Sequence, residues 1–288
     1  MSEGNYLESQ YEMIDKLEIT ENTRVVYQGV EGAFAEQAAA NYFGEHVKRF
    51  HVDKFEEILT CLEEGKADYG VLPIENSSAG FVSGTYDLLL NHDVCIVAET
   101  IIQIEQSLLA IKGASLSDID IVYSHPQGLL QSKDFLDQHN WQQIAYANTA
   151  MAAKKIKEDG MKNQAAIASK RAAMLYDLEV LEPCINFANT NATRFVILTT
   201  KRMYCRDAKK ISISFALPHK SGALYSILGH FIHNDLNMTS IESSPLKDSP
   251  WEYKFFITFE GNMSDEAVKN AIASIKEEAL AFRVLGNY

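Results

Sequence analysis

The sequence predicts an α/β fold in two parts, a larger region followed by a smaller C-terminal domain. Two observations lead to this prediction. From residue 23 onward, a short apolar strand, a polar turn and a helix follow one another repeatedly. After the polar and basic segment 199–210, strands that alternate apolar and polar residues replace this pattern. The change places the domain boundary within that segment.

The composition excludes several classes of protein. The 288 residues are 47% hydrophobic, which is enough for a large core and two domains. A formal net charge of −13 argues against nucleic acid and anionic lipid as partners, because both are negatively charged. No apolar run approaches the roughly 20 residues of a membrane span, and the first residues lack the features of a secretory signal. Four scattered cysteines without a CxxC pair indicate reduced thiols and a cytoplasmic location, and no zinc site.

The first 22 residues are polar and carry a weak helical pattern. Leu7, Tyr11, Ile14 and Leu17 recur at helical spacing. This spacing predicts a short N-terminal helical arm over residues 1–22, either solvated or left from a further domain.

The larger region repeats one strand–turn–helix unit. The expected strands are residues 24–29, 68–76, 118–124, 142–148 and 164–169. The expected helices are residues 34–43, 85–92, 127–139, 150–159 and 170–178. Because helices separate successive strands, the strands should be largely parallel.

The C-terminal domain has a different order of elements. Strands are expected at residues 211–217, 238–243, 253–259 and 282–284, and helices at 224–232 and 268–275. The order is βαββαβ. It predicts a ferredoxin-like domain, with both helices on one face of an antiparallel sheet.

Polar turns follow several strands of the larger region, at the edge where α/β sheets bind ligands. They contain Gly29 and Gly32 in YQGVEGAF, Glu75 to Ser78 in IENSSAG, Ser124 and His125 in YSHPQG, and Asn148 and Thr149 in YANTA. Each turn alone also fits an ordinary helix cap. As a set, they resemble a pocket for a small carboxylate, because neutral donors and helix N-termini favour anions. The stretch NATRFVILTT adds Thr193 and Arg194, directly before a buried strand.

With these motifs in order, residues 24–285 resemble the prephenate dehydratase family with a C-terminal ACT regulatory domain. The resemblance rests on GVEGAFAEQAA, GVLPIENSSAG, SHPQ, NTAMAA and above all NATRFVIL, and on GALYSIL and IESSP in the second domain. It implies a periplasmic-binding-protein-like catalytic region of two α/β lobes at residues 23–200. Lobe 1 would comprise about 23–100 and 180–200, lobe 2 about 101–179, and the ACT domain 209–288.

The resemblance also implies an activity that needs no cofactor. Prephenate would lose carbon dioxide and hydroxide to give phenylpyruvate in phenylalanine biosynthesis, driven by aromatisation. Thr193 would be catalytic by donating to the leaving hydroxyl, and Glu75 would act on that hydroxyl or order its loop. Arg194 would bind a substrate carboxylate, or position Thr193 through a salt bridge with Glu75. The other substrate-binding candidates are Asn76, Ser77, Ser124, Gln131, Thr149 and Phe195. Two alternatives stay open: an arogenate dehydratase, and a non-catalytic amino-acid or carboxylate binding protein.

For the ACT domain, the resemblance implies feedback inhibition by L-phenylalanine. The ligand would bind at the interface of two ACT domains, in a homodimer or homotetramer. The candidate residues are Gly222, Ala223, Leu224, Asn237, Met238 and Glu242. The family's ESRP motif reads Glu242-Ser243-Ser244-Pro245 here. A serine therefore replaces the usual arginine, and the lost charge bears on the strength of inhibition.

Overall fold

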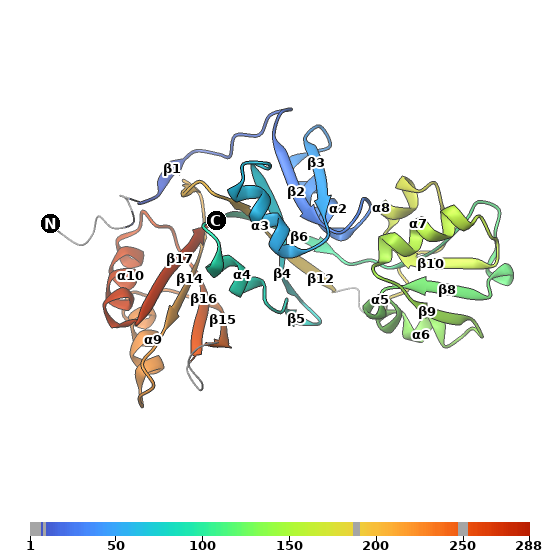
Figure 1. The fold of residues 1–288 in the computed structure, drawn as a ribbon. Helices are drawn as coiled ribbons and strands as arrows, with labels where there is room; N and C mark the ends of the chain where they lie inside the picture. The colour runs from blue at the N-terminus through green and yellow to red at the C-terminus, as the bar shows by residue number, and fades with distance from the viewer. Residues whose placement is uncertain (1–6, 8–9, 187–190, 247–252) are drawn as a thin grey trace. The chain divides into compact units, whose positions relative to one another are not determined.

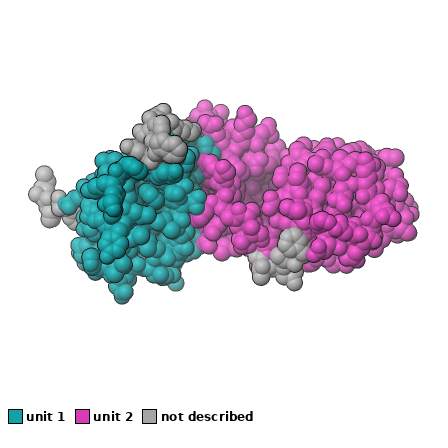
Figure 2. All heavy atoms as spheres, turned by 90° about the horizontal axis from the view of Figure 1, so that it is seen from below, with its two compact units in different colours: residues 1–19, 86–99, 197–288 teal, residues 20–85, 100–196 magenta. Residues whose placement is uncertain are grey.

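The computed structural model describes residues 7, 10–186, 191–246 and 253–288, in two compact units (Figures 1 and 2). Unit 1 comprises residues 1–19, 86–99 and 197–288, and unit 2 comprises 20–85 and 100–196. This division differs from the predicted domain boundaries, since residues 86–99 group with the C-terminal part. The reason is that strands β6 (Cys95–Gln103) and β12 (Ala192–Thr199) each begin in one unit and end in the other.

Lobe 1 of unit 2 is built on a sheet with the strand order β6-β12-β4-β2-β3. Its elements in chain order are β2 (Arg24–Gln28), α2 (Phe34–Phe43), β3 (Lys48–Val52), α3 (Phe55–Glu63), β4 (Tyr69–Asn76) and β5 (Gly80–Phe81). Strand β2 pairs in parallel with both β3 and β4, and β5 folds back antiparallel onto the end of β4. Strand β3 was not predicted from the sequence, because this edge strand has no fully buried residue and so lacks a strong apolar pattern.

Lobe 2 of unit 2 is a separate five-stranded sheet with the order β11-β7-β10-β8-β9. Its elements are β7 (Ser107–Ala110), η2 (Leu116–Asp118), β8 (Ile121–Ser124), α5 (Pro126–Gln131), α6 (Lys133–Leu136), β9 (Gln142–Ala145), α7 (Thr149–Asp159), β10 (Gln164–Ala168), α8 (Lys170–Leu175) and β11 (Glu179–Glu182). Strand β8 is parallel to β9 and β10, whereas β7 is antiparallel to β10 and β11. The single helix expected over 127–139 is in fact two, divided at Ser132.

Unit 1 contains the predicted βαββαβ domain. Its elements are β14 (Lys210–Ala216), α9 (Ala223–His233), β15 (Met238–Pro245), β16 (Tyr253–Glu260), α10 (Glu266–Glu278) and β17 (Ala281–Asn287). The sheet order is β15-β16-β14-β17, and α9 and α10 lie on one face (Figure 1). Their apolar side chains, among them Phe231 and Ile272, pack against Ile213 and Ile257 of the sheet. The ferredoxin-like order expected from the sequence is confirmed.

The other face of this sheet contacts α4 (Thr85–Asn91). Tyr86 stacks on Phe256 with ring centroids 4.5 Å apart, and Asp87 pairs with Lys254 at 2.7 Å. Arg283 donates to the carbonyl oxygens of Leu90, His92 and Val94 at the end of the helix. Strand β17 then pairs with the first half of β6, where Gly286 lies opposite Ile96. A Cβ at Gly286 would lie 2.0 Å from the Ile96 carbonyl oxygen, so this approach requires glycine.

The predicted N-terminal helix is wrong for residues 12–14. They form β1 (Glu12–Ile14), which pairs in parallel with β13 (Met203–Cys205) in the segment expected to be a linker. The apolar residues behind the helical pattern anchor this segment within unit 1 instead. Leu7 is buried in the core of the unit, and the Tyr11 hydroxyl donates to the Val284 carbonyl. No helix in the described part of the chain has the length and apolar character needed to cross a bilayer.

Candidate active site

Asn76 is the last residue of β4, and its side chain joins this strand to the start of β12. The Oδ1 atom accepts hydrogen bonds from the backbone N–H groups of Ser78 (3.0 Å) and Ala79 (2.9 Å). Two donors fix the orientation of the carboxamide, because a flipped amide would place its own NH₂ against them. The Nδ2 atom therefore donates toward β12, where Thr193 Oγ1 lies at 2.9 Å.

This contact determines what the Thr193 hydroxyl can do. A hydroxyl has one hydrogen and two acceptor lone pairs. Asn76 occupies a lone pair, so the hydroxyl acts as an acceptor toward β4. Among the described residues, Thr193 Oγ1 has Asn76 as its hydrogen-bond partner and no acceptor for its own hydrogen. The hydrogen is available to a bound molecule, as hydrogen-bond stabilisation of a leaving hydroxyl requires.

Asn191, which was not predicted as a site residue from the sequence, belongs to the same cluster. Its side-chain oxygen accepts from Asn76 Nδ2 at 2.9 Å and from Ser78 Oγ at 3.4 Å. Asn191 is only 2% exposed, and its Nδ2 has no hydrogen-bond partner in the described structure. The available signal was its place two residues before Thr193, but an asparagine before a strand more often only caps a turn.

Glu75 and Arg194 form an ion pair beside the Asn76–Thr193 contact. Arg194 Nε lies 3.2 Å from Glu75 Oε2, and both side chains are about one-third exposed, at 31% and 34%. Consecutive residues of a strand point to opposite faces. The pair Glu75–Arg194 therefore lies on one face, and the pair Asn76–Thr193 lies on the other. The salt bridge that the sequence offered as one role for Arg194 is present, and the alternation favours an ordering role for Glu75.

The loop after β4 is held against β12 by its backbone. Ser77 N–H donates to the Ala192 carbonyl at 2.9 Å, and Ala192 N–H donates to Ser77 Oγ at 2.9 Å. Ser77 thus contributes to the alignment of the two strands. Phe195, expected at the pocket wall, is 3% exposed and on the same face of β12 as Thr193. Together these contacts hold Thr193 at one position along the edge of lobe 1.

In lobe 2, Ser124 and Thr149 both lie close to Gly128. A Cβ at Gly128 would be 2.6 Å from Ser124 Oγ and 3.4 Å from Thr149 Cγ2. Ser124 is fully buried, and its hydroxyl donates to the Ile167 carbonyl at 2.7 Å. Its single hydrogen is therefore already used. His125 caps α5 by accepting from Gln127 N–H at 3.2 Å, which is the structural role favoured by the sequence.

Gln131 and Thr149 remain as the other two predicted groups of lobe 2. Gln131 ends α5, is 7% exposed, and has an Oε1 atom without a hydrogen-bond partner among the described residues. Thr149 begins α7, whose cap is Asn148, since Asn148 Oδ1 accepts from Met151 N–H at 2.7 Å. Thr149 is therefore not the N-cap residue of α7, although its position in the sequence suggested that role.

The six candidate residues of the C-terminal domain do not gather at one place within a single chain. Gly222 caps the start of α9, and Ala223 and Leu224 open that helix. Asn237 and Met238 follow the far end of α9, about 16 Å away by the rise of an 11-residue helix. Asn237 Nδ2 donates to Glu260 at 3.1 Å, and Glu242 lies opposite Phe256 in the sheet.

Comparison with known protein families identifies the larger region. Residues 25–203, more than half of the chain, match the family model described as prephenate dehydratase. The chain belongs to the prephenate dehydratase family. The match nearly coincides with the catalytic region expected at residues 23–200 and contains the Asn76–Thr193 cluster. The βαββαβ domain follows the end of the match.

Relatives of this family resemble almost the whole chain. A bifunctional chorismate mutase/prephenate dehydratase of Pseudomonas aeruginosa is 35% identical over 274 residues, which cover 94% of this chain and 74% of the relative. Arogenate dehydratase/prephenate dehydratase 2 of Arabidopsis thaliana is 36% identical and covers 92% of this chain and 72% of its own length. The crystal structure of prephenate dehydratase from Arthrobacter aurescens in complex with L-Phe is 29% identical. It superposes with a TM-score of 0.85 and covers 92% of this chain and 89% of its own.

The chemistry of a prephenate dehydratase agrees with the donor set of this site. Among the described residues, no group of three or more His, Cys, Asp or Glu side chains is placed to hold a metal ion. The cluster around Thr193 consists of a hydroxyl and carboxamides, joined by one Glu–Arg pair. Neutral donors of this kind stabilise charge that develops on a departing oxygen.

Proposed function

We propose that this protein converts prephenate into phenylpyruvate, carbon dioxide and water in the biosynthesis of L-phenylalanine. The observation that carries the proposal is the hydrogen bond from Asn76 to Thr193, within a chain of the prephenate dehydratase family. The ring carboxylate leaves as carbon dioxide, and its bonding electrons enter the ring. The opposite C–O bond breaks, so the hydroxyl leaves with its electron pair. Aromatisation drives the reaction, which therefore needs no cofactor.

Thr193 serves the departing hydroxyl in this proposal. Its oxygen accepts from Asn76, so its hydrogen is directed to the substrate. A threonine hydroxyl is too weak an acid to release a free proton at neutral pH. Its contribution is a hydrogen bond that strengthens as negative charge develops on the leaving oxygen, worth a factor of about 100 to 1,000 in rate. The leaving hydroxide takes up one proton from the solvent, so each turnover consumes one proton and releases water.

The remaining candidates divide between binding and positioning. Glu75 orients Arg194, and Arg194 is either a ligand for a substrate carboxylate or a support for Thr193. Asn76, Ser77 and Phe195 hold or flank Thr193. In lobe 2, Gln131 and Thr149 would bind the substrate's carboxylates and carbonyl, and Ser124 supports them, because its hydrogen is already donated to Ile167.

An assay with prephenate tests the proposal directly. Phenylpyruvate formed by the purified protein is measured by its ultraviolet absorbance in alkali. Thr193→Ala should lower kcat by about 100-fold or more while the circular dichroism spectrum and Tm stay unchanged. Tight binding of prephenate without turnover would instead identify a binding protein. Near-normal kcat in Thr193→Ala would overturn the catalytic role of this residue.

Arogenate is the second candidate substrate. It differs from prephenate by an amino group in place of the side-chain ketone. The Arabidopsis thaliana relative, 36% identical, is named for both activities. The ratio of kcat/KM for the two substrates, measured on the same preparation, decides between them.

L-Phenylalanine is the proposed regulator, bound by the βαββαβ domain acting as an ACT domain. A relative with a TM-score of 0.85 was crystallised in complex with L-Phe. Because the two groups of candidate residues lie at opposite ends of α9, two chains would have to join them in one site, which favours a homodimer or homotetramer. L-Phenylalanine should lower the rate or the substrate affinity, and if neither responds the regulatory proposal fails. A cytoplasmic location stays a prediction from the sequence.

A further inference from the structure

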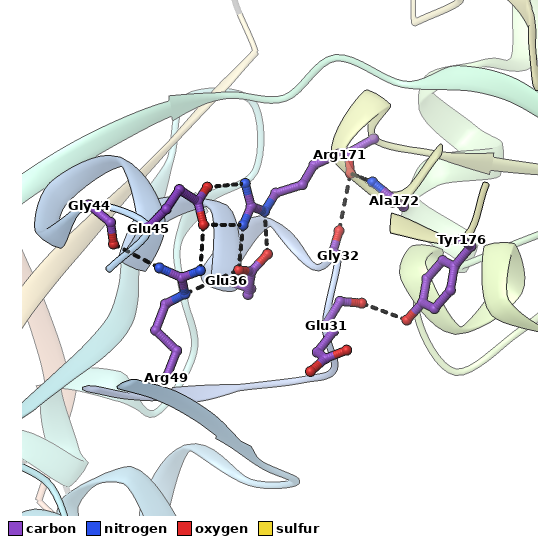
Figure 3. Close-up of polar contacts among 10 residues, drawn as sticks. Glu31, Gly32, Glu36, Gly44, Glu45, Arg49, Arg171, Ala172 and Tyr176 are labelled. Carbon is purple, nitrogen blue, oxygen red and sulfur yellow. Dashed lines mark hydrogen bonds and ion pairs between the residues drawn. The ribbon is translucent and has the colours of Figure 1, made fainter. Parts of the chain in front are cut away.

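Arg171 of lobe 2 contacts two carboxylates of lobe 1 (Figure 3). Its guanidinium binds Glu36 through Nε and through Nη2, the latter at 2.6 Å, and binds Glu45 through Nη1 at 2.9 Å. Glu36 lies on α2 with a side chain only 7% exposed, whereas Glu45 just after α2 is 66% exposed. A paired guanidinium–carboxylate fork of this kind sets both distance and orientation. The two lobes are therefore joined at a defined separation here.

A second arginine completes the network from within lobe 1. Arg49 of β3 lies 3.3 Å from Glu36 and 2.5 Å from Glu45, and it also donates to the Gly44 carbonyl (Figure 3). Two arginines thus balance two glutamates, which allows Glu36 to be buried with its charge compensated. The hydrogen bond from Arg171 lowers the pKa of Glu45 to about 2, well below its ordinary value.

Two hydrogen bonds from the same part of lobe 2 fix the turn before α2. Ser169 Oγ donates to the Gly32 carbonyl at 3.1 Å. The Tyr176 hydroxyl donates to the Glu31 carbonyl at 2.7 Å (Figure 3). Gly32 has a φ of +84°, and a Cβ there would lie 3.2 Å from Ala172 Cα. We name Ser169, Arg171 and Tyr176, with their partners in residues 31–45, the α8 latch.

The α8 latch is separate from the hinge between the lobes. The chain crosses between the lobes through residues 104–106 and again between Glu182 and Ala192. These crossings are hydrogen-bonded to each other, Asn186 to Gln106 and Ile104, and Ile104 to Asn191. A cavity of ≈ 380 Å³, lined by α2, residues 101–103, Glu105 and residues 169–171, lies between the hinge and the Arg171 pairs, and Lys170 of α8 pairs with Glu105 of the hinge at 3.2 Å. A hinge alone leaves rotation about its axis free, and a contact away from that axis stops it.

We propose that Arg171 is a positioning residue, which sets the lobe separation at which Thr193 of lobe 1 and Thr149 of lobe 2 reach the same substrate. The inference rests on the proposed function, because it concerns a substrate held between the lobes. Without the latch, the lobes sample wider separations, and only a fraction of molecules is competent to bind. The apparent KM rises by the inverse of that fraction. At saturation, the substrate's own contacts close the lobes, so kcat changes little.

The first test compares Arg171→Met and Arg171→Lys with the wild type. Arg171→Met should raise KM about tenfold if the competent fraction falls to about one-tenth, with kcat within about twofold. Arg171→Lys keeps the positive charge but loses the two-pronged guanidinium contact, so its KM should lie between those of the wild type and Arg171→Met. Arg24→Met is the matched control, since Arg24 forms a similar pair with Asp68 inside lobe 1, and its KM should stay unchanged.

Two milder variants keep the test valid if Arg171→Met does not fold. Glu45→Gln changes an exposed carboxylate, and Tyr176→Phe removes one hydroxyl. Each should raise KM by a few-fold in the same direction. Salt should raise the wild-type KM by a larger factor than the KM of Arg171→Met, because the network is partly exposed and therefore screened.

Hydrogen–deuterium exchange gives a readout that does not depend on activity. The backbone N–H groups of residues 31–36 should exchange faster in Arg171→Met than in the wild type and in Arg24→Met. If exchange is faster in Arg171→Met but the wild type does not turn over prephenate, the latch stands and the proposed function fails. A folded Arg171→Met variant with unchanged KM and unchanged exchange would overturn the latch, as would a fall in kcat at constant KM.

Discussion

Replacing Asn76 by aspartate tests how the Thr193 hydroxyl is oriented. The introduced side chain would keep an acceptor for the N–H groups of Ser78 and Ala79, but it would place a carboxylate oxygen where Nδ2 now donates to Thr193. The hydroxyl would have to reverse and donate its only hydrogen to this carboxylate. The hydrogen that serves the leaving group would then be lost. Asn76→Asp should therefore affect the rate more than Asn76→Ala, although aspartate is closer in shape.

The size of the effect follows from the contacts. Asn76→Ala removes the orienting donor, and a hydrogen bond of this kind contributes about 0.5–1.5 kcal/mol, or a factor of roughly 2 to 13 in kcat. Asn76→Asp also removes the transition-state hydrogen bond, so a loss of about 100-fold or more is expected. The loss should diminish as the pH falls through the pKa of the introduced carboxyl group, because its protonated form can again donate to Thr193.

The assay is a pH profile of kcat, measured by phenylpyruvate formation. Asn22→Asp serves as a control for added negative charge, because Asn22 is exposed and outside the cluster. Wild-type activity in Asn76→Asp at neutral pH would refute the assignment of Asn76 as donor to Thr193. A smaller loss for aspartate than for alanine would refute it equally.

Three further predictions concern stability and reactivity. Pairing with Arg171 lowers the pKa of Glu45 to about 2 in the folded protein. The pairing therefore stabilises the fold at pH values above the ordinary pKa of a glutamate, and this stabilisation is lost as the pH falls from about 5 to 2. The urea midpoint of Glu45→Gln should depend less on pH across this window than that of the wild type. Gly286→Ala would force a methyl group against the Ile96 carbonyl oxygen 2.0 Å away, and it should destabilise the protein by about 1–3 kcal/mol in urea unfolding. The control is Gly160→Ala, where the added Cβ meets open space but φ is +64°; this substitution should cost about 1 kcal/mol. Burial raises the pKa of the Cys95 thiol to about 12, so a thiol reagent should label exposed Cys184 in the native protein and reach Cys95 only after unfolding; labelling of native Cys95 as fast as Cys184 would contradict its burial.

The sequence predicted many of the elements whose apolar residues follow a clear pattern, but it did not predict β6 or the fully buried β7. Strands β2, β4, β8 and β10 are buried runs, and the C-terminal domain alternates cleanly, so both patterns led to the right elements. The N-terminal segment failed because four apolar residues at helical spacing also suit a strand and a buried anchor. Leu7 packs in the core, whereas Ile14 lies in β1. Spacing over so few residues does not distinguish these outcomes.

Sequence motifs predicted part of the candidate site but not its hydrogen bonds. Glu75 and Asn76 were noticed because they follow a predicted strand, at the edge where α/β sheets bind ligands, whereas Thr193 was assigned through the resemblance of NATRFVIL to the family's motif. Which group donates and which accepts in each hydrogen bond could not be predicted from the sequence. Ser124 looked like a ligand for the substrate, but its hydroxyl is committed to Ile167, and Asn191 was missed although it accepts from Asn76. Both facts depend on which atoms face each other across segments far apart in the chain.

The α8 latch could not be predicted from the sequence for a different reason. Glu36 and Arg171 are 135 residues apart, and each alone resembles an ordinary charge on a helix surface. Burial gives the pair its significance, because a carboxylate that is only 7% exposed needs hydrogen-bonding and charged partners to offset its lost hydration. Removing Arg171 would leave Glu36 with Arg49 alone, inside lobe 1. The charge of Glu36 would then be balanced within lobe 1, and the ion pair that joins lobe 1 to lobe 2 would be lost. Glu36, the second glutamate of GVEGAFAEQAA, therefore acts on the separation of the lobes through a partner in the other lobe.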